Sequence, residues 1–176
     1  KIGTPSHIGI FYLSSFIADF RKLYPGIKFE IISKSTADMV EMLETRKIDL
    51  IVDTLPIYTT KNSVKKITLS RLQNCFAYNK VSFPNADINC VEDLKKYPLV
   101  LPSATASIRG KLNEFVESKN VQLYPGLESW TTEMMLEMVR RGVGIGYFIK
   151  NVIEIQKDKD DFEVITFGDE LPAVDV

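Results

Sequence analysis

The sequence predicts an α/β fold built as two lobes, and three observations support this prediction. Helical and strand-like apolar patterns alternate along the chain, the links between them are short, and an extended stretch separates two blocks of similar size. Alternation of this kind is typical of a parallel sheet with helices on its faces. We expect lobe I to comprise residues 1–72 plus 162–176, because the last strand returns after the second block, and lobe II to comprise residues 73–161.

The first block predicts the order strand, helix, strand, helix, strand. Apolar residues at Leu13, Phe16, Ile17 and Phe20 have helical spacing, and the stripe is wide enough to contact two neighbours. Ser35 is a suitable N-cap for the second helix. The expected elements are a strand at 1–4, a helix at 6–23, a strand at 27–32, a helix after Ser35 and a strand at 48–52.

The second block follows an extended stretch at 67–78. Its Gly142, Gly144 and Gly146 follow a helix and precede an apolar strand, which is the wrong context for a dinucleotide-binding loop. We expect a helix C-cap at Gly142 and close packing at the other two glycines. The expected elements are helices at 91–96, 107–118 and 131–141, and strands at 98–101, 126–129, 143–148 and 162–167.

Composition argues against several functional classes, although a local basic patch is compatible with it. Twenty-two basic and 23 acidic residues give a net charge of −1, so there is no global attraction to nucleic acid or to an anionic membrane. No apolar run approaches the roughly 18 to 20 residues that span a bilayer. Cys75 and Cys90 are expected as reduced thiols in a cytoplasmic protein, since no export signal is visible.

Metal and catalytic motifs are also missing from the sequence. His7 is the only histidine, and neither a CxxC pair nor a GxSxG elbow occurs. We therefore expect no metal, no cofactor and no enzymatic activity. The chain opens without a methionine, directly in a strand, and is expected to be a fragment of a longer protein.

Hydroxyl-rich loops stand between strands and helices in both blocks. Helix N-termini offer free N–H groups and a partial positive charge, so such loops can bind a carboxylate or phosphate. The simpler alternatives are N-capping by Ser6 and Ser107, core packing for Trp130, and a solvated side chain for Arg109. Asp53, at the end of its strand, is a weaker candidate. The predicted ligand-binding residues are Thr4, Pro5, Ser6, His7, Ser103, Ala104, Thr105, Ser107, Trp130 and Thr131.

Several segments, taken in order, resemble the effector-binding domain of LysR-type transcriptional regulators. The order and spacing of these segments carry the resemblance over nearly the whole chain. Arg46, where the family often has Gly, and Ile149, where it usually has Pro, depart from the pattern. The segments are Ile2-Gly3-Thr4, Phe20-Arg21-Lys22-Leu23-Tyr24-Pro25, Ile48-Asp49-Leu50-Ile51-Val52, Leu94-Lys95-Lys96-Tyr97-Pro98-Leu99-Val100 and Met138-Val139-Arg140-Arg141-Gly142-Val143-Gly144-Ile145-Gly146.

The resemblance implies a fold like that of type 2 periplasmic binding proteins, with two Rossmann-like lobes and a small-molecule cleft between them. It implies that the hydroxyl loops line an effector site, and that the 6–23 helix packs against the 107–118 helix of a partner in a homodimer or tetramer. DNA would be bound only through an N-terminal winged-helix domain that this chain lacks. The isolated chain is therefore not expected to bind DNA specifically.

The implied function is a ligand sensor that modulates DNA binding and transcription. We expect the effector to be a small organic anion, with an apolar or aromatic part that stacks on Trp130. The alternative from another class is an exported solute-binding protein of a transporter, which shares the fold. An enzyme similar to prephenate dehydratase is disfavoured because its Thr-Arg-Phe motif does not occur.

Overall fold

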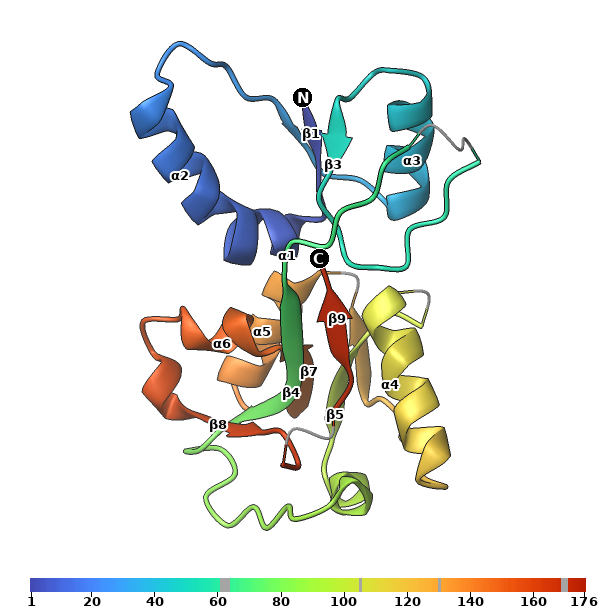
Figure 1. The fold of residues 1–176 in the computed structure, drawn as a ribbon. Helices are drawn as coiled ribbons and strands as arrows, with labels where there is room; N and C mark the ends of the chain where they lie inside the picture. The colour runs from blue at the N-terminus through green and yellow to red at the C-terminus, as the bar shows by residue number, and fades with distance from the viewer. Residues whose placement is uncertain (61–63, 105, 130, 169–170) are drawn as a thin grey trace. The chain divides into compact units, whose positions relative to one another are not determined.

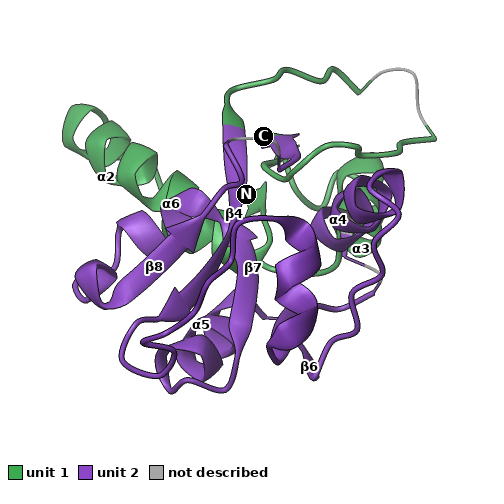
Figure 2. Ribbon diagram, turned by 90° about the horizontal axis from the view of Figure 1, so that it is seen from below, with its two compact units in different colours: residues 1–71, 175–176 green, residues 72–174 purple. Residues whose placement is uncertain are grey.

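The computed structural model describes residues 1–60, 64–104, 106–129, 131–168 and 171–176. The chain forms two compact units, shown by colour in Figure 2. Unit 1 is Lys1–Arg71 with Asp175–Val176, and unit 2 is Leu72–Val174. Each unit has a sheet with helices beside it (Figure 1), which confirms the predicted α/β class.

Unit 1 contains a small sheet in which all pairings are parallel, as the first block predicts. Its strand order is β2-β1-β3, with Ile2 opposite both Ile31 and Leu50. The strands are β1 (Ile2–Gly3), β2 (Ile31–Ile32) and β3 (Leu50–Ile51); the helices are α1 (Ser6–Ile8), the π-helical turn η1 (Gly9–Leu13), α2 (Ser14–Leu23) and α3 (Thr36–Glu44).

Local sequence explains part of unit 1 and tertiary packing the rest. Ser35 caps α3 as predicted, because its hydroxyl accepts from the Asp38 N–H at 3.2 Å. The strands at 27–32 and 48–52 are shorter than predicted, and Leu50 is 44% exposed. Within the described sheet β3 is an edge, so its outer side lacks a neighbour that would bury these side chains.

Unit 2 contains a larger mixed sheet in the order β6-β5-β7-β4-β8, with β9 also paired to β4. β5 is parallel to β6 and β7, whereas β4 is antiparallel to β7 and β8. Its elements are β4 (Arg71–Asn79), the 3-10 helix η2 (Val91–Lys96), β5 (Leu99–Pro102), α4 (Ser107–Ser118), β6 (Leu127–Ser129), α5 (Thr132–Arg140), β7 (Ile145–Ile149), α6 (Lys150–Glu154), the 3-10 turn η3 (Lys159–Asp161), β8 (Phe162–Ile165) and β9 (Ala173–Asp175).

The structure corrects the predicted lobe boundary at the C-terminal end. Residues 162–174 were assigned to lobe I, but they belong to unit 2, and only Asp175–Val176 return to unit 1. The reason is strand pairing, since Phe76 lies opposite Ile165 and β9 also pairs with β4. The helix α6 and the strand β9 were not predicted. None of the helices within the described ranges is long and apolar enough to cross a membrane.

The three glycines of the 142–146 run serve the packing roles expected of them. Gly142 has a φ of +75°, the left-handed conformation typical just after a helix. A β-carbon on Gly144 would lie 2.4 Å from the Pro98 carbonyl oxygen, and one on Gly146 would lie 2.6 Å from a methyl carbon of Val139. Glycine therefore allows β7 to approach β5 and α5 closely enough to pair and pack.

We expect Gly144→Ala to destabilise the chain by about 1 to 3 kcal/mol, because its new methyl group would collide with backbone that cannot move away cheaply. Gly110→Ala in α4 is the control, since a β-carbon there meets nothing within 4 Å and should stabilise the helix by roughly 0.5 to 1 kcal/mol. Urea unfolding of both variants tests this. Equal stability of the two variants would contradict it.

Candidate functional site

The first hydroxyl loop begins at the carboxyl end of β1. Thr4 is 1% exposed, and its hydroxyl makes only a long contact of 3.4 Å to the Pro5 carbonyl oxygen. Pro5 is the N-cap residue of α1 and provides no side-chain cap, whereas Ser6 and His7 are half-buried residues inside the helix. Ser6 is therefore not the N-cap of α1, and the capping alternative does not describe this loop.

A pocket of about 330 Å³ opens beside Thr4 and Ser6. Its walls combine hydroxyl groups with the apolar side chains of η1, α2 and β2. Sequence reasoning missed Ser33, although it stands in a Ser-Lys-Ser-Thr run between a strand and a helix, the pattern that identified the other loops. The lining residues are Thr4, Ser6, Gly9, Ile10, Leu13, Ser14, Ile17, Ile31 and Ser33.

The second hydroxyl loop follows β5 in unit 2. The backbone N–H of Ser103 donates to the Ser129 carbonyl oxygen at 2.8 Å, and Ser103 is 8% exposed. Its hydroxyl has no hydrogen-bond partner within the described part of the chain. Ala106 is the N-cap of α4 and offers no side-chain acceptor. Ala104 is exposed, Ser107 is the first residue of α4, and Thr105 lies outside the described residues.

The third turn joins β6 to α5. Ser129 ends β6 and is 6% exposed, and its hydroxyl accepts from the Thr131 N–H at 3.2 Å. Thr131 is the exposed N-cap of α5, and its side chain makes no capping bond. Trp130 lies outside the described residues. Ser129 is a second hydroxyl that sequence reasoning missed, although the end of the predicted 126–129 strand marked its position.

Arg109 is not the solvated side chain that was expected. It is 7% exposed and donates from Nη1 to the Pro102 carbonyl oxygen at 3.0 Å and to Glu128 Oε1 at 2.9 Å. Its Nε donates to Asn113 Oδ1 at 3.0 Å. The guanidinium is thus bound within unit 2, where one of its acceptors, Pro102, directly precedes Ser103.

Asp53 occupies the corresponding end of β3 in unit 1. It is 6% exposed, and it accepts from the Thr36 hydroxyl at 2.7 Å and from the Thr54 N–H at 2.6 Å. Burial raises the pKa of this carboxyl group above its usual value, and the hydrogen bonds from Thr36 and Thr54 oppose that shift. Asp53 therefore holds the side chain of Thr36, the first residue of α3, while Ser35 provides the cap for a backbone N–H of that helix.

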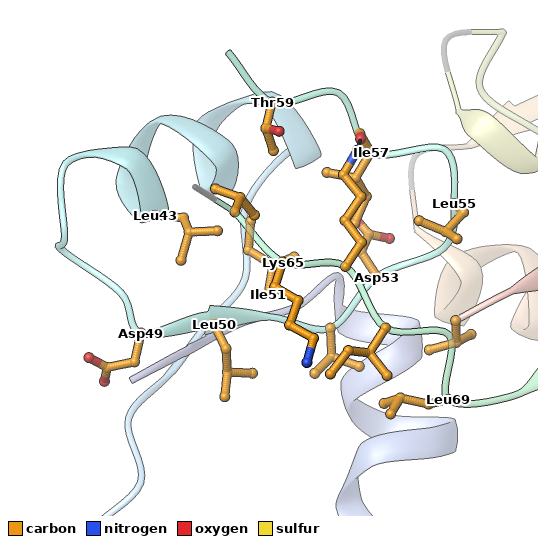
Figure 3. Close-up of a pocket in the computed structure, with 15 residues that line it drawn as sticks. Leu43, Asp49, Leu50, Ile51, Asp53, Leu55, Ile57, Thr59, Lys65 and Leu69 are labelled. Carbon is orange, nitrogen blue, oxygen red and sulfur yellow. Dashed lines mark hydrogen bonds between the residues drawn. The ribbon is translucent and has the colours of Figure 1, made fainter. Parts of the chain in front are cut away.

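A larger pocket, of about 440 Å³, lies beside the free edge of β3 (Figure 3). Its walls come from β3, from Leu43 of α3 and from residues 55–59 and 64–69, and most of the described lining side chains are apolar. Asp53 lines it and Asp49, at its rim, pairs with the N-terminal amino group. None of the predicted binding residues that the structure describes contributes to this pocket.

The described residues contain no group of three or more histidine, cysteine, aspartate or glutamate side chains placed to hold a metal ion. The two cysteines are unpaired, with Cys75 buried and Cys90 exposed. Burial raises the pKa of the Cys75 thiol to about 12, so it stays protonated and unreactive at neutral pH. The hydroxyl-rich loops therefore provide hydroxyl and backbone N–H groups for hydrogen bonding.

The raised pKa of Asp53 predicts a pH dependence of stability. Between the ordinary aspartate pKa of about 3.9 and the raised value, the folded chain binds more protons than the unfolded chain, so the free energy of unfolding falls as pH rises. Asp53→Asn should remove this part of the slope, whereas Asp19→Asn on exposed α2 should keep it. Urea unfolding from about pH 4 to 7 measures the slope. Identical slopes for wild type and Asp53→Asn would contradict the expectation.

Comparison with known proteins gives a consistent result. A family model described as the LysR substrate binding domain matches residues 1–174. The chain is 23% identical over 154 residues to the HTH-type transcriptional regulator CysB of Burkholderia cenocepacia. That alignment covers 84% of this chain and 47% of CysB, so the chain spans about half the length of this curated relative.

Solved structures share the fold at low sequence identity. The cofactor-binding domain of the Cbl transcriptional regulator is 14% identical with a TM-score of 0.81, covering 99% of this chain and 76% of that one. The effector-binding domain of QuiR, solved in complex with shikimate, is 15% identical with a TM-score of 0.78, covering 99% and 82%. Reduced OxyR from N. meningitidis is 18% identical with a TM-score of 0.78, covering 99% and 82%.

These likenesses confirm the predicted fold class, that of LysR effector-binding domains with their type 2 periplasmic-binding-protein-like architecture. The resemblance read from the sequence is confirmed by the family match, which extends over almost the entire chain. This chain belongs to the LysR substrate binding domain family.

Proposed function

We propose that this chain is the effector-sensing part of a transcriptional regulator, and that a small organic anion is its effector. The observation that carries the proposal is the Ser103 hydroxyl, which is without a partner in the described part of unit 2 and stands beside a helix start with no side-chain cap. The family match and the regulators among its relatives support this function over a transporter's solute-binding protein.

An anionic effector fits the distribution of acceptors at the helix starts. The start of α3 already receives a capping hydroxyl from Ser35 of its own unit, and the Thr36 hydroxyl beside it is held by Asp53. The starts of α1 and α4 have Pro5 and Ala106 at their N-caps, and neither supplies an acceptor. A carboxylate bound at one of these helix starts would supply one, with a hydroxyl donor from Thr4 in unit 1 or from Ser103 in unit 2.

The proposed site comprises the ten predicted residues, with Ser33 and Ser129 added from the structure. Pocket lining by Thr4, Ser6 and Ser33 supports the unit 1 part. The apolar side chains of the same pocket support a ligand with an apolar or aromatic part. Trp130, the only tryptophan, follows Ser129 directly in the chain and is proposed to stack on that part. Shikimate in the QuiR domain is one example of a small organic anion held by this fold.

The regulatory step is proposed to be a shift between two arrangements of the regulator that bind the effector unequally. DNA would be bound by a separate winged-helix domain rather than by this chain. The net charge of −1 supports the assignment of DNA binding to that other domain, because this chain has no overall positive charge to attract DNA.

Self-association as a homodimer or tetramer is also proposed. The helix α2 contributes no buried residue to unit 1, and Phe16, Phe20 and Leu23 are 56%, 39% and 73% exposed. Apolar side chains gathered in this way commonly mark an interface. The α4 helix of a partner copy is the surface implied by the family resemblance.

Ligand binding is tested by a thermal-shift screen of small carboxylates, followed by Ser103→Ala and Thr4→Val. Each substitution should cost about 1.5 to 3 kcal/mol of binding free energy if its hydroxyl bonds the charged group. Ser118→Ala, at the far end of α4, is the matched control and should bind normally. Stabilisation by cationic or neutral compounds only, or full affinity in both site variants, would refute the proposed site.

Self-association is tested by sedimentation of the chain at high concentration. Leu23→Glu should shift the wild-type oligomer to a monomer, because a charge would be buried at the proposed contact. Ala18→Glu, on the opposite side of α2, should leave the oligomer intact. A wild-type chain that is already monomeric would contradict the proposal.

A further inference from the structure

A buried cation occupies an unexpected place in unit 2. Arg109 lies in the first turn of α4, where the helix dipole disfavours positive charge. Its side chain is nevertheless only 9% exposed. A guanidinium withdrawn from water is destabilising unless hydrogen bonds and opposite charge compensate it. Helix stability therefore does not explain why arginine stands at this position.

The compensation comes from three segments that meet around the guanidinium. Nη1 contacts the Pro102 carbonyl oxygen at the end of β5 and the Glu128 carboxylate in β6, at 3.0 and 2.9 Å. Nε contacts Asn113 one turn further along α4, at 3.0 Å. The planar fork of arginine can hold acceptors in these separate directions at once, whereas the single ammonium of lysine cannot reproduce that geometry.

Each strand group held by Arg109 directly precedes a hydroxyl residue of the candidate site. Ser103 follows Pro102, and Ser129 follows Glu128. The two serines are themselves joined, because the Ser103 N–H donates to the Ser129 carbonyl oxygen at 2.8 Å. The position of Arg109 thus controls where β5 and β6 end relative to the start of α4.

We propose that Arg109 is a positioning residue of the ligand site, which holds the ends of β5 and β6 against the first turn of α4 so that Ser103 and Ser129 keep their relative placement. The role is indirect, because Arg109 contacts Pro102, Asn113 and Glu128 of its own unit and acts through the loops that follow them. The inference rests on the proposed function, which places the effector at these hydroxyl groups.

Amide hydrogen exchange of the whole chain tests this role without any ligand. In Arg109→Met the Ser103 amide should exchange at least about tenfold faster, while β4 amides in the same sheet stay within about twofold of wild type. Arg109→Lys, which keeps the charge and is safer for folding, should show a smaller acceleration with the same local pattern. Arg141→Met is the matched control, since that arginine follows the last residue of α5 with a side chain that is 74% exposed, and it should change neither set.

Titration with benzoate, followed through the single tryptophan, then connects the position of the loop to binding. Both Arg109 variants should bind benzoate at least about fivefold more weakly than Arg141→Met does. If exchange in the Arg109 variants is accelerated uniformly across unit 2, Arg109 stabilises the whole unit and the positioning role is refuted. Unchanged exchange at the Ser103 amide would also overturn the proposal. If wild type binds no benzoate, the titration uses a carboxylate that stabilises the chain in the thermal-shift screen, and exchange at Ser103 decides the role of Arg109 without any ligand.

Discussion

The N–H groups in the first turn of a helix have no acceptors within that helix, and this constraint organises the candidate site. At α3 the Ser35 hydroxyl accepts from the Asp38 N–H, while the buried carboxylate of Asp53 accepts from the side-chain hydroxyl of Thr36. At α1 and α4 the capping positions are Pro5 and Ala106, whose side chains accept no hydrogen bond. The helix α3 therefore has a side-chain cap from its own N-cap residue, whereas the N-cap residues of α1 and α4 provide none.

Strand direction determines where those helix starts gather. In unit 1 all pairings are parallel, so Thr4, Ser33 and Asp53 follow three neighbouring strands at one edge of the sheet. In unit 2 the parallel pair β5 and β6 places Ser103 and Ser129 side by side. The close approach of β7 to β5, which depends on the absence of a side chain at Gly144, lies at the opposite, amino end of β5, where Leu99 pairs with Ile145.

Two buried charges accompany this arrangement, and they differ in how they are compensated. Asp53 is held by neutral donors, so burial dominates and its pKa is raised. Arg109 has a carboxylate as well as two neutral acceptors, and Glu128 remains 42% exposed, so water still reaches one side of that pair. Buried ionic groups of this kind contribute more to local geometry than to net stability.

Sequence pattern alone determined the order of the elements and most of their boundaries. The 107–118 helix and the cap at Ser35 were predicted because helical spacing and capping chemistry are local properties. The carboxyl-edge loops were predicted for the same reason, since a strand followed by hydroxyl residues and a helix is visible in the sequence. What the pattern could not supply was which of those hydroxyl groups have internal partners.

Tertiary structure decided the features that depend on residues distant in sequence. Residues 162–174 belong to unit 2 because β8 pairs with β4. The hydrogen bonds between these two strands depend on the folded sheet, and the order of segments along the chain does not reveal them. Arg109 was expected in solvent, since its acceptors Pro102 and Glu128 come from two different strands and only folding brings them to one guanidinium. The local sequence pattern specifies which segments become helices and strands. Which side chains are buried, and which groups they bond to, is decided only when the helices and strands pack together.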